Sequence, residues 1–277
     1  MKKLLALILC AVISFTFVAV VSAENAETVK IKISISNSGD LVVNKTIDVS
    51  DEDDDGTITI NDALLAVHEI EFTGGVAEGY SSQETDYGIS ITKLWGDTSG
   101  CFGYYLNNAS AWSLADPIKE GDYVYAFVYS DKESWSDTYM YFDRTEISVS
   151  AGDEISLELK MSGYDAEWNP ISMPVGSATV TVDGIATDFV TDSEGKVKFS
   201  LDKAGEYSIS VNHTEYTVVP PVCVVSVKDA TVDESTDSSD EAVKPGDISN
   251  ILVFVVIAIA SVFAISILTS KRNENAF

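Results

Sequence analysis

The stretch TVKIKISISNSGDLVVNKTIDV, residues 28–49, contains the pattern that decides the fold of its part of the chain. Apolar residues occupy every second position from Val29 to Ile35, which is typical of a half-buried β-strand. The turn sequence NSGD (37–40) comes next, and residues 41–49 predict a returning strand. These residues therefore predict an antiparallel hairpin with one apolar face.

A helix and further strands are predicted after this hairpin. Ala63, Leu64, Val67 and Ile70 recur at helical spacing within residues 61–72. Strands are predicted near residues 87–95, 102–106, 121–129 and 137–143. Two strands, a helix and more strands are the element order of an α+β domain, which we place at residues 28–145.

Residues 146–227 have the pattern of an all-β domain. Ile155, Leu157 and Leu159 alternate with polar residues, and the turn sequences DG (183–184) and DSEG (192–195) separate further short strands. Regular short strands without a helical segment predict a β-sandwich. The segment resembles the immunoglobulin-like domains of bacterial surface proteins.

The two ends of the sequence have the composition of targeting segments. Residues 1–23 combine a basic start, an apolar run and small residues at the end, which predicts a cleaved secretory signal peptide. Residues 251–270 are apolar and long enough for a single C-terminal transmembrane helix. Basic residues open the segment 271–277, which predicts a cytoplasmic tail. We therefore expect an extracellular ectodomain attached to the cell membrane.

The C-terminal end also resembles a Gram-positive cell-wall sorting signal. The motif-like stretch KPGDISN (244–250), the apolar run and the basic tail carry this resemblance, but the Thr after which sortase cleaves is missing. A membrane anchor is therefore favoured over covalent attachment to the wall, and the sequence leaves both open.

The chain is strongly acidic, with 17 Lys and Arg against 44 Asp and Glu and a formal net charge of −27. Such a surface repels phosphate backbones, so no nucleic-acid partner is expected. It favours cationic partners such as calcium. Residues 228–250 are acidic and lack aromatic side chains, which predicts a disordered stalk between the domains and the membrane.

Residues 51–62, DEDDDGTITIND, fit the twelve-position EF-hand calcium loop. Its spacing assigns six residues as Ca²⁺ ligands: Asp51, Asp53, Asp55, Thr57, Thr59 and Asp62. Gly56 stands at the position where the loop turns sharply. The Asp at the last position and the strand before the loop resemble a dockerin half-site, but a dockerin needs two such repeats and only one is found. The alternative is a solvated acidic loop without an ion.

Aromatic residues are concentrated between Tyr80 and Phe142. Tyr123, Tyr125 and Phe127 alternate with aliphatic residues, so they share one face of a predicted strand. Such side chains either fill a core or form a face that stacks on a flat ligand, a sugar ring or a partner domain. The candidate ligand-binding residues are Trp95, Tyr104, Tyr105, Trp112, Tyr123 and Tyr125.

The runs LWGDTSGCFGYYLNN (94–108) and IKEGDYV (118–124) resemble the β-grasp domain related to the C-terminal part of transcobalamin. Some of these secreted bacterial domains carry a dockerin-like insert that ends in Asp-Ala-Leu, as residues 62–64 do. The resemblance implies a β-grasp-like domain at residues 28–145 with the calcium loop as an insert. In cobalamin carriers this domain caps the corrin ring beside a helical barrel, which this chain lacks.

No catalytic motif is found in the sequence. His68 and His213 stand alone, and no phosphate loop, G-x-S-x-G or H-E-x-x-H motif is present, so we do not expect an enzyme. Cys101 and Cys223 lie in different predicted domains, and free buried thiols are favoured over a bridge between them.

The sequence thus predicts a calcium-stabilised binding or adhesion protein of the cell surface. An aromatic-rich β-grasp-like head would be presented on an immunoglobulin-like spacer, with Ca²⁺ as cofactor. The expected partners are the membrane and an unidentified surface ligand or protein. The alternative is surface capture of a small planar ligand, such as a corrinoid, for uptake, and a lesser alternative is a surface hydrolase of unrecognised type.

Overall fold

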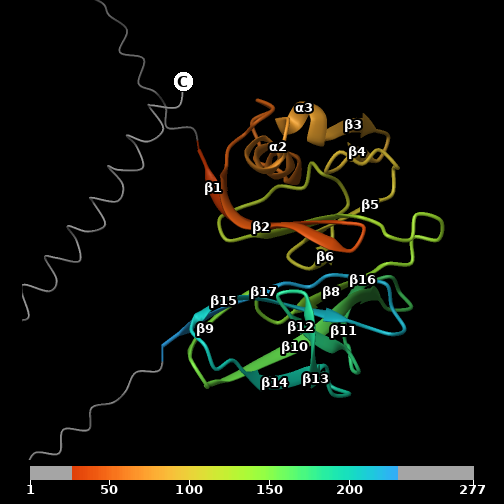
Figure 1. Ribbon diagram of the computed structural model, residues 1–277. Helices are drawn as coiled ribbons and strands as arrows, with labels where there is room; N and C mark the ends of the chain where they lie inside the picture. Colours follow the sequence, from red (N-terminus) through yellow and green to blue (C-terminus); the bar gives the residue numbers. More distant parts are fainter. Residues whose placement is uncertain (1–26, 230–277) are drawn as a thin grey trace, which may run out of the picture. The chain divides into compact units, whose positions relative to one another are not determined.

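A computed structural model describes residues 27–229, which belong to one compact unit (Figure 1). The predicted signal peptide, the apolar stretch 251–270, the tail 271–277 and nearly all of the predicted stalk lie outside the described residues. Within residues 27–229, neither helix has the length and apolar character needed to cross a membrane.

The predicted fold class is wrong. Strands make up 51% of the described residues and helices 8%, so residues 27–229 form a large all-β sandwich fold rather than an α+β β-grasp-like domain followed by a separate sandwich. The expectation gave the helical pattern at 61–72 too much weight. Most of the remaining described chain has the two-residue alternation of strands, and only two short helices, α2 (Ile60–Glu71) and α3 (Gly75–Gly79), interrupt it.

The N-terminal hairpin forms the edge of a five-stranded sheet in the order β2-β1-β7-β5-β6. β1 pairs antiparallel with β2 and parallel with β7, and β5 pairs antiparallel with β7. The bounds of these strands are β1 (Val29–Asn37), β2 (Asp40–Val49), β5 (Phe102–Leu106), β6 (Ala109–Ser110) and β7 (Tyr123–Val128). The predicted hairpin at residues 28–49 is therefore confirmed.

One face of this sheet is aliphatic and is covered by α2. Ile33 on β1, Leu64 on α2 and Val124 on β7 are fully buried in the shared core. The alternation predicted for residues 123–129 places the aliphatic residues of β7 on this side. A two-stranded sheet of β3 (Ser81–Thr85) and β4 (Gly88–Lys93) follows the helices.

Two further sheets form a second layered core. Their orders are β11-β10-β8-β16, with β14 also paired to β10, and β13-β12-β15-β17-β9. Leu157, Val180 and Val225 are buried between them. The strands are β8 (Thr138–Phe142), β9 (Glu146–Ser150), β10 (Glu154–Tyr164), β11 (Pro170–Pro174), β12 (Thr179–Val182), β13 (Ile185–Val190), β14 (Lys196–Ser200), β15 (Gly205–Asn212), β16 (Val218–Val219) and β17 (Cys223–Lys228).

Strand β8 pairs differently from what its place in the sequence suggests. The sequence places residues 137–143 with the first group of strands, but β8 hydrogen-bonds to β10 and β16. Both edges of β7 are already occupied, by β1 and by β5, so β8 has no position beside it. The second sheet group therefore includes a strand from before residue 146.

An aromatic layer joins β5 and β7 to β8 and β16. Its members are Tyr105, Tyr123, Tyr125, Phe127, Tyr129, Tyr139, Tyr141 and Val219. The Tyr125 hydroxyl donates to the Pro220 carbonyl at 2.7 Å, and the Tyr139 hydroxyl donates to Asn108 Oδ1 at 2.9 Å. Buried tyrosines need such hydroxyl partners, so this layer combines apolar packing with specific hydrogen bonds.

Candidate metal centre

The acidic loop at residues 51–62 connects the end of β2 to the start of α2. Asp51 folds the loop by accepting hydrogen bonds from the backbone N–H groups of Asp55 at 3.1 Å and Gly56 at 2.8 Å. Gly56 has a φ of +91°, which is the left-handed conformation that a residue with a Cβ adopts only with strain. The glycine thus stands where the sequence predicts a sharp turn.

Three of the predicted metal ligands converge in this loop. Asp51, Asp53 and Asp55 each offer a carboxylate oxygen, and these oxygens all lie within 4.8 Å of one another. Partial desolvation raises the pKa of Asp53, and the nearby charges of Asp62 and Asp55 raise it further. The carboxylates therefore repel one another, and a cation at their centre would remove the repulsion.

Asp62, the predicted final ligand, has a different set of contacts. It is fully buried, and its Oδ2 accepts from the Thr59 N–H at 2.8 Å and the Thr59 hydroxyl at 2.7 Å. Its Oδ1 accepts from the N–H of Glu52 at 2.8 Å. Asp62 and Thr59 form a capping box at the N-terminus of α2, so these two residues close the loop through hydrogen bonds.

The C-terminal half of the loop is fixed against the segment 114–118. The N–H of Ile118 donates to the Ile58 carbonyl at 2.9 Å, and the N–H of Asn61 donates to the Leu114 carbonyl at 2.9 Å. The Asn61 side chain donates to Asp53 Oδ2 at 3.0 Å. The site is thus built on a helix N-terminus and a backbone ladder, with only its acidic half exposed.

The residues present fit a calcium ion in their chemistry. Ca²⁺ takes hard oxygen ligands, and Asp51, Asp53 and Asp55 supply carboxylates at one point. Thr57 lies in the exposed half of the same loop, whereas Thr59 is buried at the helix cap. The structure therefore brings three of the six predicted ligands together and gives Thr59 and Asp62 a capping role.

The predicted aromatic ligand set is not gathered on one face. Trp95 and Tyr104 pack against the core under α2, while Tyr105, Tyr123 and Tyr125 belong to the aromatic layer. Tyr125 is only 1% exposed, so no ligand can stack on it. Trp112 is 91% exposed and stands apart from the others.

His68 is a satisfied core residue. The N–H of Trp95 donates to its Nε2 at 3.2 Å, so Nδ1 carries the proton and donates to the Leu64 carbonyl at 2.6 Å. Its ring stacks on Tyr80 with a centroid distance of 5.0 Å. Burial lowers the pKa of His68 to about 4, and the side chain is neutral at physiological pH.

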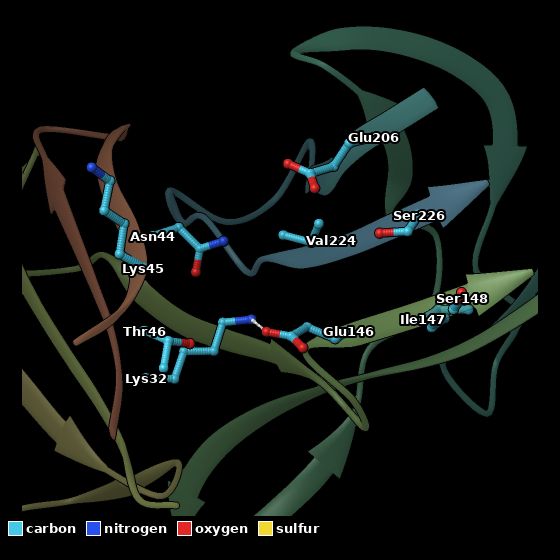
Figure 2. A pocket seen from close by; sticks show the side chains of 10 residues that line it. All are labelled: Lys32, Asn44, Lys45, Thr46, Glu146, Ile147, Ser148, Glu206, Val224 and Ser226. Atoms are coloured by element: carbon cyan, nitrogen blue, oxygen red, sulfur yellow. Dashed lines mark hydrogen bonds and ion pairs between the residues drawn. The ribbon is translucent and has the colours of Figure 1, made fainter. Parts of the chain in front are cut away.

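Sequence reasoning missed a cleft of about 490 Å³ that is lined by residues of β1, β2, β9, β15 and β17 (Figure 2). The Lys32 ammonium points across it to Glu146, with an Nζ to Oε1 distance of 3.0 Å, and also donates to the Thr145 carbonyl at 3.1 Å. These residues are more than 110 positions apart in sequence, so only the long-range packing of the strands could reveal the cleft.

Cys101 and Cys223 are both buried, and within residues 27–229 they are free thiols. Burial raises the pKa of Cys223 to about 12. A thiol this resistant to ionisation is a poor nucleophile, so packing accounts for Cys223. The preference for free thiols over a bridge is confirmed.

In comparisons with known proteins, no family model matches the chain and no curated protein matches it. The resemblances to the transcobalamin-related domain and to dockerin therefore stay predictions that rest on the residues quoted above.

Proposed function

We propose that the chain is a calcium-stabilised binding protein of the cell surface. The observation that carries this proposal is the convergence of Asp51, Asp53 and Asp55, whose carboxylate oxygens lie within 4.8 Å of one another. Their position in a twelve-residue loop with Gly56 at the turn is a second support. It is independent of the first, because the spacing in the sequence does not require the carboxylates to converge, and their convergence does not require this spacing.

A bound calcium ion would stabilise the connection between β2 and α2. β2 ends at Val49 and α2 begins at Ile60, so the acidic loop spans the whole connection. Neutralising its three carboxylates would hold the loop closed and keep α2 over the aliphatic face of the sheet. Binding to the folded state alone would stabilise by about 0.4–1.4 kcal/mol, for millimolar free calcium and a Kd of about 10⁻⁴–10⁻³ M.

A structural role is favoured over a sensing role. Calcium sensors open a helix pair to expose an apolar groove. Here the apolar side of α2 is occupied, because Leu64 and Val67 are fully buried against the first sheet. Calcium would therefore stabilise a surface that other residues present to a partner.

An extracellular location is part of the proposal, and residues 1–23 support it because their composition is that of a secretory leader. Millimolar calcium outside cells suits the weak binding expected of a single loop. Nothing in the described residues favours corrinoid capture or hydrolysis, so these two alternatives are not carried forward.

Isothermal titration of the full chain with CaCl₂ tests the proposal. We expect one site with a Kd of about 10⁻⁴–10⁻³ M, the range of extracellular calcium modules. Asp53→Ala and Asp55→Ala should each abolish the heat, because each removes a converging carboxylate. Asp202→Ala, an exposed acidic residue outside the loop, is the matched control and should bind as the wild type does. Equal heats from all four proteins would remove the site.

A further inference from the structure

Two turns of the chain repeat one local pattern. The sequences YSDKESW (129–135) and YDAEW (164–168) each run from Tyr to Asp, then Glu, then Trp. We call them the first and second Trp turns. In each turn the Tyr and Trp rings contact one another, with centroids 6.0 Å apart in both cases.

Both turns hold their tryptophan in an uncommon backbone conformation. Trp135 has a φ of +55° and Trp168 a φ of +64°, a region that bulky residues rarely adopt. In each turn the Asp carboxylate accepts backbone N–H groups: Asp131 from Glu133 and Ser134, and Asp165 from Glu167 and Asn169. The two aspartates therefore brace turns that point an aromatic ring outward.

The two tryptophans are exposed although they are the largest apolar side chains in their turns. Trp135 is 58% exposed and Trp168 is 80% exposed. An exposed ring held on a braced turn loses little conformational freedom when it binds, which is a property of binding residues in protein interfaces.

The topology brings the two Trp turns to the same end of one sheet. β8 and β10 are antiparallel, with Met140 opposite Met161, so the segment before β8 lies beside the segment after β10. The first Trp turn ends at Trp135, just before β8, and the second begins at Tyr164, the last residue of β10, and leads to β11. Burial raises the pKa of Tyr105 to about 12, and the hydroxyls of Tyr129 and Tyr164 contribute, so one tyrosine of each turn lies near Tyr105.

The surroundings of the tryptophans are acidic. Residues 129–137 and 164–169 contain five carboxylates, Asp131, Glu133, Asp137, Asp165 and Glu167, against one cation, Lys132. Lys132 is already paired with Asp97 at 2.6 Å. Within the described part of the chain, Glu133 and Glu167 have no ion-pair partner.

We propose that Trp135 and Trp168 form a paired aromatic surface that binds a Lys- and Arg-rich segment of a protein partner. Cationic side chains are attracted to the faces of tryptophan rings, and guanidinium groups also stack on them. Glu133 and Glu167 supply the opposite charge from the same turn as each ring, and the net charge of −27 attracts such a partner from a distance. The inference rests on the proposed binding function and gives it a partner class.

The test is NMR of the full chain labelled with ¹⁵N, titrated with a hexa-arginine peptide. The chain has four tryptophans, so four indole N–H signals are available. We expect the signals of Trp135 and Trp168 to shift, and those of Trp95 and Trp112 to stay. The double variant Trp135→Ala/Trp168→Ala should weaken peptide binding by about tenfold or more, and Trp135→Phe/Trp168→Phe should retain part of it.

Matched controls distinguish peptide binding at the two tryptophans from the general electrostatic attraction of a cationic peptide to an acidic protein. Trp112→Ala removes a still more exposed ring from a segment that hydrogen-bonds to β4, and it should leave peptide affinity unchanged. Glu133→Gln/Glu167→Gln should weaken binding and reduce its dependence on salt. Hexa-glutamate and hexa-N-acetylchitohexaose, an acidic peptide and a neutral sugar, should leave all four indole signals in place.

Three results would overturn the proposal. The first is that the indole N–H signals of Trp135 and Trp168 do not shift when hexa-arginine is added. The second is peptide binding that survives the double Trp→Ala substitution, which would place it elsewhere on the acidic surface. The third is a shift of both signals by hexa-N-acetylchitohexaose but not by the peptide, which would indicate a glycan partner. Repeating the titration with chelator keeps the outcome separate from that of the calcium proposal.

Discussion

In both the acidic loop at residues 51–62 and the first Trp turn, an aspartate accepts backbone N–H groups. The pKa of an aspartate is nevertheless raised in the loop and lowered in the turn. Asp51 accepts two backbone N–H groups within its loop, and Asp131 does the same within its turn. Yet the pKa of Asp53 is raised by desolvation and by neighbouring carboxylates, whereas hydrogen bonds from Ser136, Ser134 and Glu133 lower the pKa of Asp131.

The difference teaches how to separate a metal loop from an acidic turn. In the Trp turn the Asp131 carboxylate is satisfied by N–H and O–H donors, so it needs no metal ion. In the acidic loop the oxygens of three carboxylates converge within 4.8 Å, and the proposed calcium ion would supply the opposite charge. Convergence, not the number of acids, distinguishes the two regions.

The largest expected effect is a loss of stability on substitution of Asp62. This substitution tests whether Asp62 closes the loop through hydrogen bonds or through a metal ion. Asp62→Ala leaves the buried N–H of Thr59 and the N–H of Glu52 without acceptors. We expect a loss of roughly 2–4 kcal/mol in the free energy of unfolding, measured by urea denaturation. The loss should be the same with calcium and with chelator. A loss seen only with calcium would make Asp62 a ligand instead of a cap.

The second-largest effect is a loss of stability in acid. Protonation of His68 on α2 and protonation of the loop carboxylates can both cause such a loss, and their contributions must be distinguished. Its pKa is about 4 in the folded chain and about 6.5 when unfolded. The unfolded state therefore binds the proton more readily, and stability is lost as pH falls from 6.5 towards 4, by about 3 kcal/mol in total. Urea unfolding of the wild type at several pH values measures this.

The control for the acid effect is His68→Phe, which cannot titrate. Its stability should be lower than that of the wild type at pH 7, since the partners of both ring nitrogens are lost. Its curve between pH 6.5 and 4 should be flatter. An equally steep curve would assign the acid loss to carboxylates and not to His68.

The smallest effect contrasts the two regions directly. In chelator, Asp53→Asn should raise stability slightly, by roughly 0.2–0.5 kcal/mol after solvent screening, because it removes one of the repelling charges. Asp131→Asn should lower the melting temperature, because its carboxylate accepts three hydrogen bonds from its own turn. Thermal denaturation compares the two, and shifts of the same sign would remove the distinction between the regions.

Local patterns in the sequence predicted individual elements well. The alternation at residues 28–35 and the helical spacing at 61–72 correspond to β1 and α2 within one residue or two. Long-range pairing could not be predicted in the same way. That β8 joins β10, and that the tyrosines of β7 face β8, depends on which sheet edges are free, and local periodicity does not contain this information.

The candidate site was predictable in part for the same reason. The spacing of Asp51, Asp53 and Asp55 is local, and the structure brings these residues together. The capping contacts of Asp62 were hidden because a position-12 acid and an N3 cap residue look identical in sequence. The Trp turns carry a local pattern, but its meaning required the positive φ values and the exposure of both rings.

The most direct test of the calcium claim is the melting temperature of the full chain, measured with millimolar CaCl₂ and again with excess EGTA. The account predicts a higher melting temperature in calcium for the wild type and for Asp131→Asn. It predicts no difference for Asp53→Asn/Asp55→Asn, in which two of the three converging charges are gone. An identical melting temperature of the wild type in calcium and in EGTA would contradict the account.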